Sequence, residues 1–174
     1  MLRDFNLLAT TSRGTEDYAC SELLYLLREI DDSAPNVDKT GVSGLIAAKT
    51  AFNSFDAIEK LREILHERPY EFRYTLRIIP IEKVVRTDLD EIQRAATELS
   101  LKIKENETFR ITLEKRFTQT HTQDIIEAAA ANIKREVNLS NPDKILLIEV
   151  VSRLTGLSLI KPNEILAVIK EKML

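Results

Sequence analysis

The residues with the clearest capacity for chemistry stand together in one segment, 114–122. Its cations and hydrogen-bond donors are Lys115, Arg116, Thr118, Thr120 and His121. The segment separates an alternating apolar–polar run from a helical pattern, so we expect it to lead into the N-terminus of a helix. Unpaired backbone N–H groups at such a terminus attract anions before any side chain contributes. The pattern therefore predicts a loop that can hold a phosphate.

The same residues also fit a purely structural interpretation. Thr122 can cap the helix while Lys115 and Arg116 are ordinary exposed charges. Phe117, between the basic pair and the threonines, can stack on a base or a sugar. A phenylalanine in such a place more often packs under its own loop. Residue types and spacing leave both interpretations open.

Five further basic residues are weaker candidates for contact with an anionic partner, chosen from charge and position alone. They are Arg110, Arg73, Arg77, Arg153 and Lys161. Arg73 and Arg77 are four residues apart in an extended segment, which predicts side chains on one face of a strand. Arg153 and Lys161 are expected to flank a hairpin turn.

No catalytic, cofactor or metal motif accompanies these candidates. The four glycines form neither G-x-x-x-x-G-K nor G-x-G-x-x-G, which argues against nucleotide hydrolysis and dinucleotide binding. Cys20 falls on an apolar helix stripe, where a buried inert thiol is expected, and two histidines add too few ligands for structural zinc. Carboxylates such as Glu22 are expected to be solvated. We expect no cofactor and no metal; an enzyme acting through scattered carboxylates has no residue cluster behind it.

Composition places the candidates in a globular protein with a substantial core. The 174 residues are 44% hydrophobic and 30% charged, enough for one domain or two small ones. A lone cysteine points to a reducing compartment, and we expect the cytoplasm. No apolar run nears the roughly 18 residues of a membrane span. The net charge of −3 argues against a nucleic-acid partner, yet residues 68–86 hold five basic and only two acidic residues.

The first half of the chain alternates strand and helix patterns. We expect strands at 5–11 and 45–52, a short strand near 36–42, a helix opening at Gly14–Thr15, a helix capped by Ser54, and an extended segment at 72–85. Pro80 interrupts that last segment, which indicates an edge strand or a bulge. This order fits a ferredoxin-like α+β unit.

The second half repeats the rhythm after a junction near 86–88. We expect a helix capped by Asp88, a strand at 108–114, a helix from Thr122, a central strand at 145–151, a turn containing Gly156, a strand at 157–161 and a short helix capped by Asn163. The fold class is therefore α+β, in domains 1–86 and 87–174.

Residues 88–161 resemble a THUMP domain, an RNA-binding module of tRNA-modifying enzymes. The resemblance rests on F-R-I-T-L-E-K-R at 109–116, the Thr/His loop, the Ala-rich helix near 128–133, V-N-L-S-N-P-D at 137–143, Ile148-Glu149-Val150 and Gly156. Asn138 stands where the family pattern has an aspartate. Residues 5–85 resemble the ferredoxin-like domain that accompanies THUMP, with R-G-T-E at 13–16. The resemblance thus implies a ferredoxin-like domain followed by an α/β THUMP domain.

The resemblance also implies a function. Only about a dozen residues follow Lys161, so we expect no catalytic domain and a similarity to stand-alone THUMP adaptors. Such adaptors bind the acceptor stem and CCA end of tRNA and assist a separate RNA cytidine acetyltransferase that forms acetylcytidine. Lys115, Arg116 and His121 match the family's basic loop. The alternative is a small-ligand-sensing or protein-interaction module of ferredoxin-like type that binds no RNA.

Overall fold

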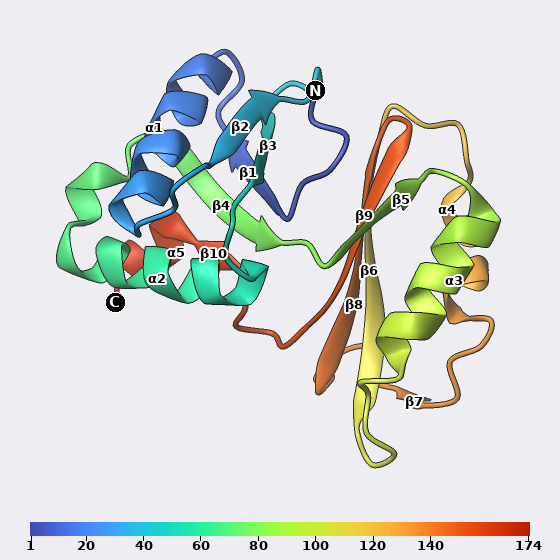
Figure 1. The fold of residues 1–174 in the computed structure, drawn as a ribbon. Helices are drawn as coiled ribbons and strands as arrows, with labels where there is room; N and C mark the ends of the chain where they lie inside the picture. The colour runs from blue at the N-terminus through green and yellow to red at the C-terminus, as the bar shows by residue number, and fades with distance from the viewer. The chain divides into compact units, whose positions relative to one another are not determined.

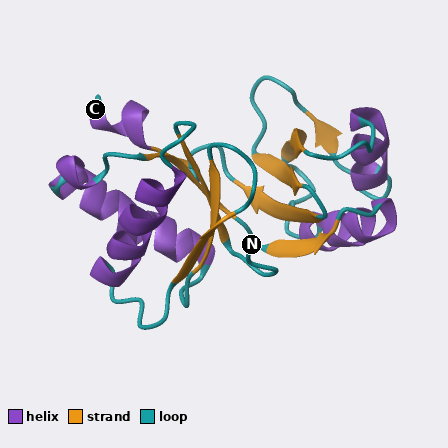
Figure 2. Ribbon diagram, turned by 90° about the horizontal axis from the view of Figure 1, so that it is seen from above, coloured by secondary structure: helices purple, strands orange, loops and turns teal.

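The computed structural model describes all 174 residues, which form two compact units. Unit 1 comprises Met1–Ile81 with Glu164–Leu174, and unit 2 comprises Glu82–Asn163. Each unit contains one sheet and its own helices (Figure 1), which confirms the α+β class. Figure 2 shows that within each unit the helices lie on one side of the strands. None of the helices is both long enough and apolar enough to span a bilayer.

Unit 1 has the ferredoxin-like arrangement that its sequence order predicts. Its elements are β1 (Leu7–Thr11), α1 (Glu16–Glu29), β2 (Asn36–Lys39), β3 (Leu45–Lys49), α2 (Ser54–Glu67), a 3-10 turn (Pro69–Glu71) and β4 (Thr75–Pro80), then β10 (Leu166–Ala167) and α5 (Val168–Lys172). The strands follow the order β10-β4-β1-β3-β2, and every pairing is antiparallel. The βαββαβ unit is therefore extended by one strand from the C-terminus.

The core of unit 1 fills the space between its helices and its sheet. Leu23 and Leu27 of α1 and Leu61 of α2 are fully buried against Ile46 of β3 and Ile78 of β4. The apolar positions recur at helical spacing on α1 and α2 and alternate along the strands, so one face of each element reaches the core. Burial of each such aliphatic side chain contributes about 1.5–3 kcal/mol before entropy opposes it.

Two local expectations for unit 1 are corrected. Asn53, not Ser54, caps α2, because its side-chain oxygen accepts hydrogen bonds from the N–H groups of Phe55 and Asp56. The extended segment 72–85 is two strands, because Pro80 ends β4 and the chain then enters the other sheet as β5 (Lys83–Arg86). Proline has no backbone N–H to extend the ladder, which explains the break.

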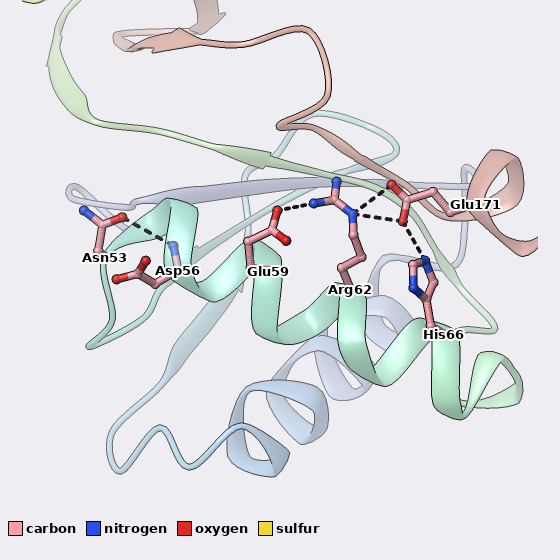
Figure 3. Close-up of polar contacts among 6 residues, drawn as sticks. All are labelled: Asn53, Asp56, Glu59, Arg62, His66 and Glu171. Atoms are coloured by element: carbon pink, nitrogen blue, oxygen red, sulfur yellow. Dashed lines mark hydrogen bonds and ion pairs between the residues drawn. The ribbon is translucent and has the colours of Figure 1, made fainter. Parts of the chain in front are cut away.

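The C-terminal segment belongs to unit 1, although the sequence places it in the second domain. Leu166 pairs with Ile78 of β4, and Leu166 and Val168 are buried in the unit 1 core. Figure 3 shows Glu171 of α5 beside α2, where its carboxylate accepts hydrogen bonds from Arg62 Nε at 3.1 and 3.2 Å. The Arg62 guanidinium also contacts Glu59. No Asn163-capped helix forms; α5 begins after Ala167.

Unit 2 is a mixed sheet with helices on one face. Its elements are β5, α3 (Leu89–Ser100), β6 (Thr108–Arg116), α4 (Thr122–Ala130), β7 (Glu136–Val137), β8 (Lys144–Val151) and β9 (Leu154–Ile160), with the strand order β5-β9-β8-β6-β7. β6 runs parallel to β7 and β8, whereas β9 is antiparallel to β8 and β5. Asp88 caps α3 as expected, accepting from the Glu91 N–H at 3.1 Å.

One turn in unit 2 lies four residues earlier than the sequence predicts. β8 and β9 are joined by Ser152–Arg153, and Gly156 lies within β9 instead of in the turn. Ser152 has a φ of 57°, a conformation that glycine or asparagine would adopt more readily. Glycine was therefore a misleading turn signal, and the actual turn is imposed by the pairing of β8 with β9.

Candidate nucleic-acid interface

The loop predicted to hold a phosphate joins the carboxyl end of β6 to the N-terminus of α4. His121 occupies the N-cap position, and neither it nor Thr122 makes a side-chain capping bond. Residues 121–124 are exposed, and the N–H groups of Thr122, Gln123 and Asp124 donate to no acceptor in the chain. An uncapped terminus of this kind presents both unpaired donors and the positive end of the helix dipole. Thr122 therefore does not cap α4, contrary to the structural interpretation of this loop.

The threonines of this loop order its backbone. Thr118 Oγ1 lies 3.2 Å from Thr120 Oγ1 and accepts from the Thr120 N–H at 3.2 Å. Lys115 Nζ donates to the Thr120 carbonyl at 2.9 Å. Both threonines are half-buried, whereas Lys115 is exposed and keeps ammonium hydrogens for another acceptor. Lys115 therefore both closes the loop and faces solvent.

Phe117 is held away from the protein. Its φ is 55°, in the left-handed region that a bulky residue rarely occupies, and 73% of its surface is exposed. It does not pack under its own loop. A strained backbone that displays an apolar ring to solvent is the kind of local conflict that concentrates at binding sites. Neither feature is visible in the residue order.

Arg116 has a structural partner that the basic-loop interpretation overlooks. Its guanidinium donates to Glu149 Oε2 at 2.7 Å, and the side chains of Arg116 and Glu149 are 18% and 1% exposed. A carboxylate buried in the apolar strand β8 requires a cation and hydrogen bonds close by. Much of the Arg116 charge is thus committed within unit 2. The sequence signal was Glu149 itself, a single acid inside the run 145–151.

The weaker basic candidates divide between separate places. Arg153 is exposed in the β8–β9 turn beside the loop, because the Ser152 N–H donates to the Arg116 carbonyl at 2.8 Å. Arg110 lies near the other end of β6. It is in register with Ile145 of β8, which pairs with Ile160 of β9, and Lys161 follows Ile160 in the chain. Six residues of strand separate Arg110 from Arg116, or about 20 Å. Arg110 donates to the Leu139 carbonyl at 3.0 Å, while its Nε is buried without a partner.

Arg73 and Arg77 belong to unit 1 and do not share a strand face. Arg73 precedes β4, and the register of β4 against β1 shifts between Arg77 and Thr75. That irregularity breaks the alternation on which their alignment depended. The Glu22 carboxylate accepts the backbone N–H groups of Arg73, Tyr74 and Thr75 at 2.5–3.2 Å, so Glu22 orders this segment and is not simply solvated.

Cysteine and metal-ligating side chains form no further candidate site beside this loop. Cys20 is half-buried, and burial is the main cause that raises the pKa of its thiol, which disfavours the reactive thiolate. No group of three His, Cys, Asp or Glu side chains is arranged to ligate a metal ion. The assembled cluster is therefore Lys115, Phe117, Thr118, Thr120, His121 and Arg153 around the α4 N-terminus, called here the β6–α4 loop site.

A sequence model of the THUMP domain matches residues 86–160, which include this loop. These residues form a THUMP domain. THUMP is typically an RNA-binding domain, and here it corresponds closely to unit 2, whereas the ferredoxin-like fold precedes it in unit 1. An uncharacterized protein of Methanocaldococcus jannaschii is 25% identical over 167 residues. The match covers 93% of this chain but only 42% of that protein, so the chain spans less than half of its curated relative.

Solved structures share this fold over most of the chain. A Pyrococcus horikoshii protein has a TM-score of 0.65 at 20% identity, covering 91% of this chain and 55% of its own. TrmN of Thermus thermophilus has a TM-score of 0.55 at 17% identity, covering 90% and 45%. A 4-thiouridine synthetase in complex with RNA and ATP has a TM-score of 0.54 at 15% identity, covering 91% and 42%. The fold of this chain thus recurs within larger proteins.

Proposed function

We propose that this chain binds the acceptor and CCA end of tRNA through the β6–α4 loop site. In this proposal it performs no chemistry and serves as an adaptor for a separate RNA cytidine acetyltransferase that forms acetylcytidine in tRNA. One observation carries the RNA-binding part: Phe117 is exposed at positive φ between Lys115 and an uncapped helix N-terminus. Aromatic ring, cation and free amides therefore belong to one loop.

The cationic and amide groups of the site suit a phosphate. The unpaired N–H groups at the start of α4 provide donors, and Lys115 from β6 and Arg153 from the β8–β9 turn can add charge-assisted hydrogen bonds. His121 donates a hydrogen bond from its ring in either protonation state. Arg116 contributes indirectly, by keeping the end of β6 fixed through Glu149. These contacts recognise a backbone and carry no base preference.

The exposed ring suits an unpaired base. Stacking on an aromatic side chain contributes about 1–3 kcal/mol per base and tolerates any base. A single-stranded 3′ end offers such bases, whereas a base in a duplex is already stacked. Phe117 therefore favours the CCA end over the acceptor stem as its contact.

The charge balance sets the strength expected of the interaction. Unit 2 carries thirteen basic and thirteen acidic residues, so no large positive field attracts RNA from a distance. Asp124 also lies in the first turn of α4 and opposes an anion there. Affinity should fall with salt with a slope that reports only a few phosphates.

The binding test compares Lys115→Ala and Phe117→Ala with the parent protein in a fluorescence-anisotropy titration of tRNA. We expect each variant to weaken binding by about fivefold to tenfold, because each removes one phosphate contact or one stacked base. Trimming CCA from the tRNA should reproduce the Phe117→Ala loss and add little to it. Lys104→Ala is the matched control, since Lys104 is an exposed lysine in the turn before β6.

Equal affinity of parent and both loop variants would refute the assignment of this site. An interaction insensitive to salt would indicate a partner other than RNA. If only Lys104→Ala loses affinity, the RNA contact must be assigned to the opposite end of β6.

The adaptor role requires a separate experiment. Bulk tRNA is incubated with a tRNA cytidine acetyltransferase, with this chain alone, and with both, and nucleosides are quantified by mass spectrometry. We expect acetylcytidine only with the enzyme and a higher yield when the chain is added. Lys115→Ala should reduce that gain. An acetylcytidine yield that does not change when the chain is added would refute the adaptor role without bearing on RNA binding.

A further inference from the structure

The edge strand β5 of unit 2 leaves part of its backbone unpaired. β5 is the first strand of the order β5-β9-β8-β6-β7 and pairs only with β9. The Thr87 N–H donates to the Arg153 carbonyl at 2.8 Å, so these two residues form a hydrogen-bonded pair. Along an antiparallel ladder such pairs alternate with pairs whose backbone groups point outward. Val84 and Arg86 therefore direct their backbone groups away from β9. The Arg86 carbonyl accepts from the Asp88 N–H, but the Val84 N–H and carbonyl meet no partner in the chain.

A shallow groove runs between this edge and α3. It has a volume of about 320 Å³ and is lined by Lys83, Val84 and Val85 of β5 and by Glu91, Arg94, Ala95 and Glu98 of α3. Val85 and Ala95 give it an apolar floor, and charged side chains form its rim. A strand added to β5 would place every second side chain in this groove, because side chains alternate across a sheet.

The rim charges are matched except for one. Lys83 pairs with Glu98 at 2.9 Å, and Arg86 pairs with Glu91 at 2.6 Å. Arg94 is exposed, and its only hydrogen bond is from Nε to the Asp90 carbonyl at 3.4 Å. Its guanidinium therefore has no carboxylate partner and is available to an acidic side chain of an occupant.

The same charges argue against other occupants. A second copy of β5 offers no carboxylate to Arg94, because the strand consists of Lys83, Val84, Val85 and Arg86. An RNA would meet Glu91 and Glu98 at the rim and Asp88 and Asp90 in the first turn of α3. An extended, mainly uncharged polypeptide with one carboxylate opposite Arg94 meets neither difficulty, because it brings a single negative charge to the one unpaired cation.

We infer that the β5–α3 groove binds an extended peptide of a partner protein. The peptide adds as a strand to β5 through the Val84 backbone, seats an apolar side chain on Val85 and Ala95, and pairs an Asp or Glu with Arg94. This inference is independent of RNA binding, because none of the groove residues belongs to the β6–α4 loop site.

The test uses a fluorescein-labelled ten-residue peptide in which valine alternates with threonine and one central valine is replaced by glutamate, and a matched peptide with lysine at that position. We expect the full-length protein to bind the glutamate peptide in an anisotropy titration, with chemical-shift changes confined to β5 and α3. Arg94→Glu should weaken binding of the glutamate peptide at least about fivefold and favour the lysine peptide instead, because a surface ion pair is replaced by repulsion.

A backbone variant separates strand addition from simple charge attraction. Val84→Pro removes only the outward N–H and no ladder bond to β9, so it should abolish peptide binding while the fold persists. Val84→Thr keeps the N–H and should bind as the parent does. Equal binding of both peptides, unchanged binding by Val84→Pro, or shifts outside the groove would overturn the inference.

The two proposals fail separately in this design. Arg94→Glu and Val84→Pro should leave tRNA affinity unchanged, just as Lys115→Ala should leave peptide affinity unchanged. If Arg94→Glu weakens tRNA and no peptide binds, the groove is an RNA surface instead. Sedimentation that reveals a dimer lost in Val84→Pro would assign the edge to a second copy.

Discussion

At the scale of single residues, the buried Glu149 carboxylate decides what Arg116 does. Glu149 is 1% exposed on a strand whose neighbouring side chains are aliphatic. Desolvation of an ionised carboxylate is costly unless a cation and hydrogen bonds lie beside it, and Arg116 supplies both at 2.7 Å. A residue chosen for RNA from its position in a basic loop thus has a prior role in the fold.

Arg116→Ala should therefore destabilise unit 2 by about 3 kcal/mol, because it leaves a buried carboxylate without its cation. Urea unfolding followed by circular dichroism measures this change. The double variant Arg116→Leu with Glu149→Leu should recover much of the loss, since no charge then remains buried. An Arg116→Ala protein as stable as the parent would mean that the guanidinium is free to bind RNA.

Phe117 presents the opposite case, a residue whose conformation opposes stability. Phe117→Gly removes left-handed strain of about 1–2 kcal/mol but makes the unfolded chain more flexible. We therefore expect the free energy of unfolding to rise by between zero and about 1 kcal/mol. Its tRNA affinity should nonetheless fall as in Phe117→Ala. Unfolding and titration on the same variants decide this. A clear loss of stability in Phe117→Gly would show that the ring packs, which its 73% exposure contradicts.

At the scale of elements, one carboxylate joins two turns of unit 1. Glu16, at the start of α1, accepts from the Gly44 N–H at 2.9 Å and from the Gly14 N–H at 3.0 and 3.1 Å. These backbone donors, Gly44 first, lower the pKa of Glu16 below its ordinary value. Gly44 itself has a φ of 76°, and a Cβ there would lie 2.9 Å from the Thr11 carbonyl oxygen. Glycine and glutamate together hold the two turns.

Because the folded pKa of Glu16 is lowered, its contribution to stability is present above the unfolded pKa near 4.3 and is lost as the pH falls below it. The stability difference between the parent and Glu16→Gln should therefore shrink from about pH 6 to about pH 3. Urea midpoints across this range test the sign. Glu63→Gln is the control, since Glu63 is exposed on α2 and accepts no hydrogen bond. A constant difference at all pH values would contradict the role of the carboxylate.

Predictability from sequence also follows the scale of the interaction. Helical and alternating apolar periodicity predicted the longer strands and helices of both units, because those patterns reflect one buried face, but not the two-residue strands β7 and β10. Asp88 was a correct cap, since a capping bond is local. The β8–β9 turn and the Arg116–Glu149 pair were missed because strand pairing decides them. In the β6–α4 loop site, residue types were predictable, whereas the exposure of Phe117 and the uncapped helix were not.

At the scale of the whole molecule, the chain returns to the unit in which it began. Residues 164–174 follow the THUMP domain, yet β10 pairs with β4 and α5 lies against α2 (Figure 1). Unit 1 is thus built from two segments that are 82 residues apart, the length of Glu82–Asn163. Residues 7–80 already contain the strands and helices of a ferredoxin-like unit, so their apolar pattern does not predict a fifth strand.

The C-terminal segment should therefore stabilise unit 1 and leave unit 2 almost unchanged. Leu166 is fully buried, so Leu166→Ala should cost about 2–5 kcal/mol through lost burial and the cavity left behind. Ile169→Ala is the matched control, because Ile169 lies on α5 and is 61% exposed. Hydrogen exchange read by mass spectrometry should then show faster exchange in β1 and β4 but not in β6 and β8. Faster exchange in both units alike would mean that they unfold as one, and no change would mean that β10 is dispensable.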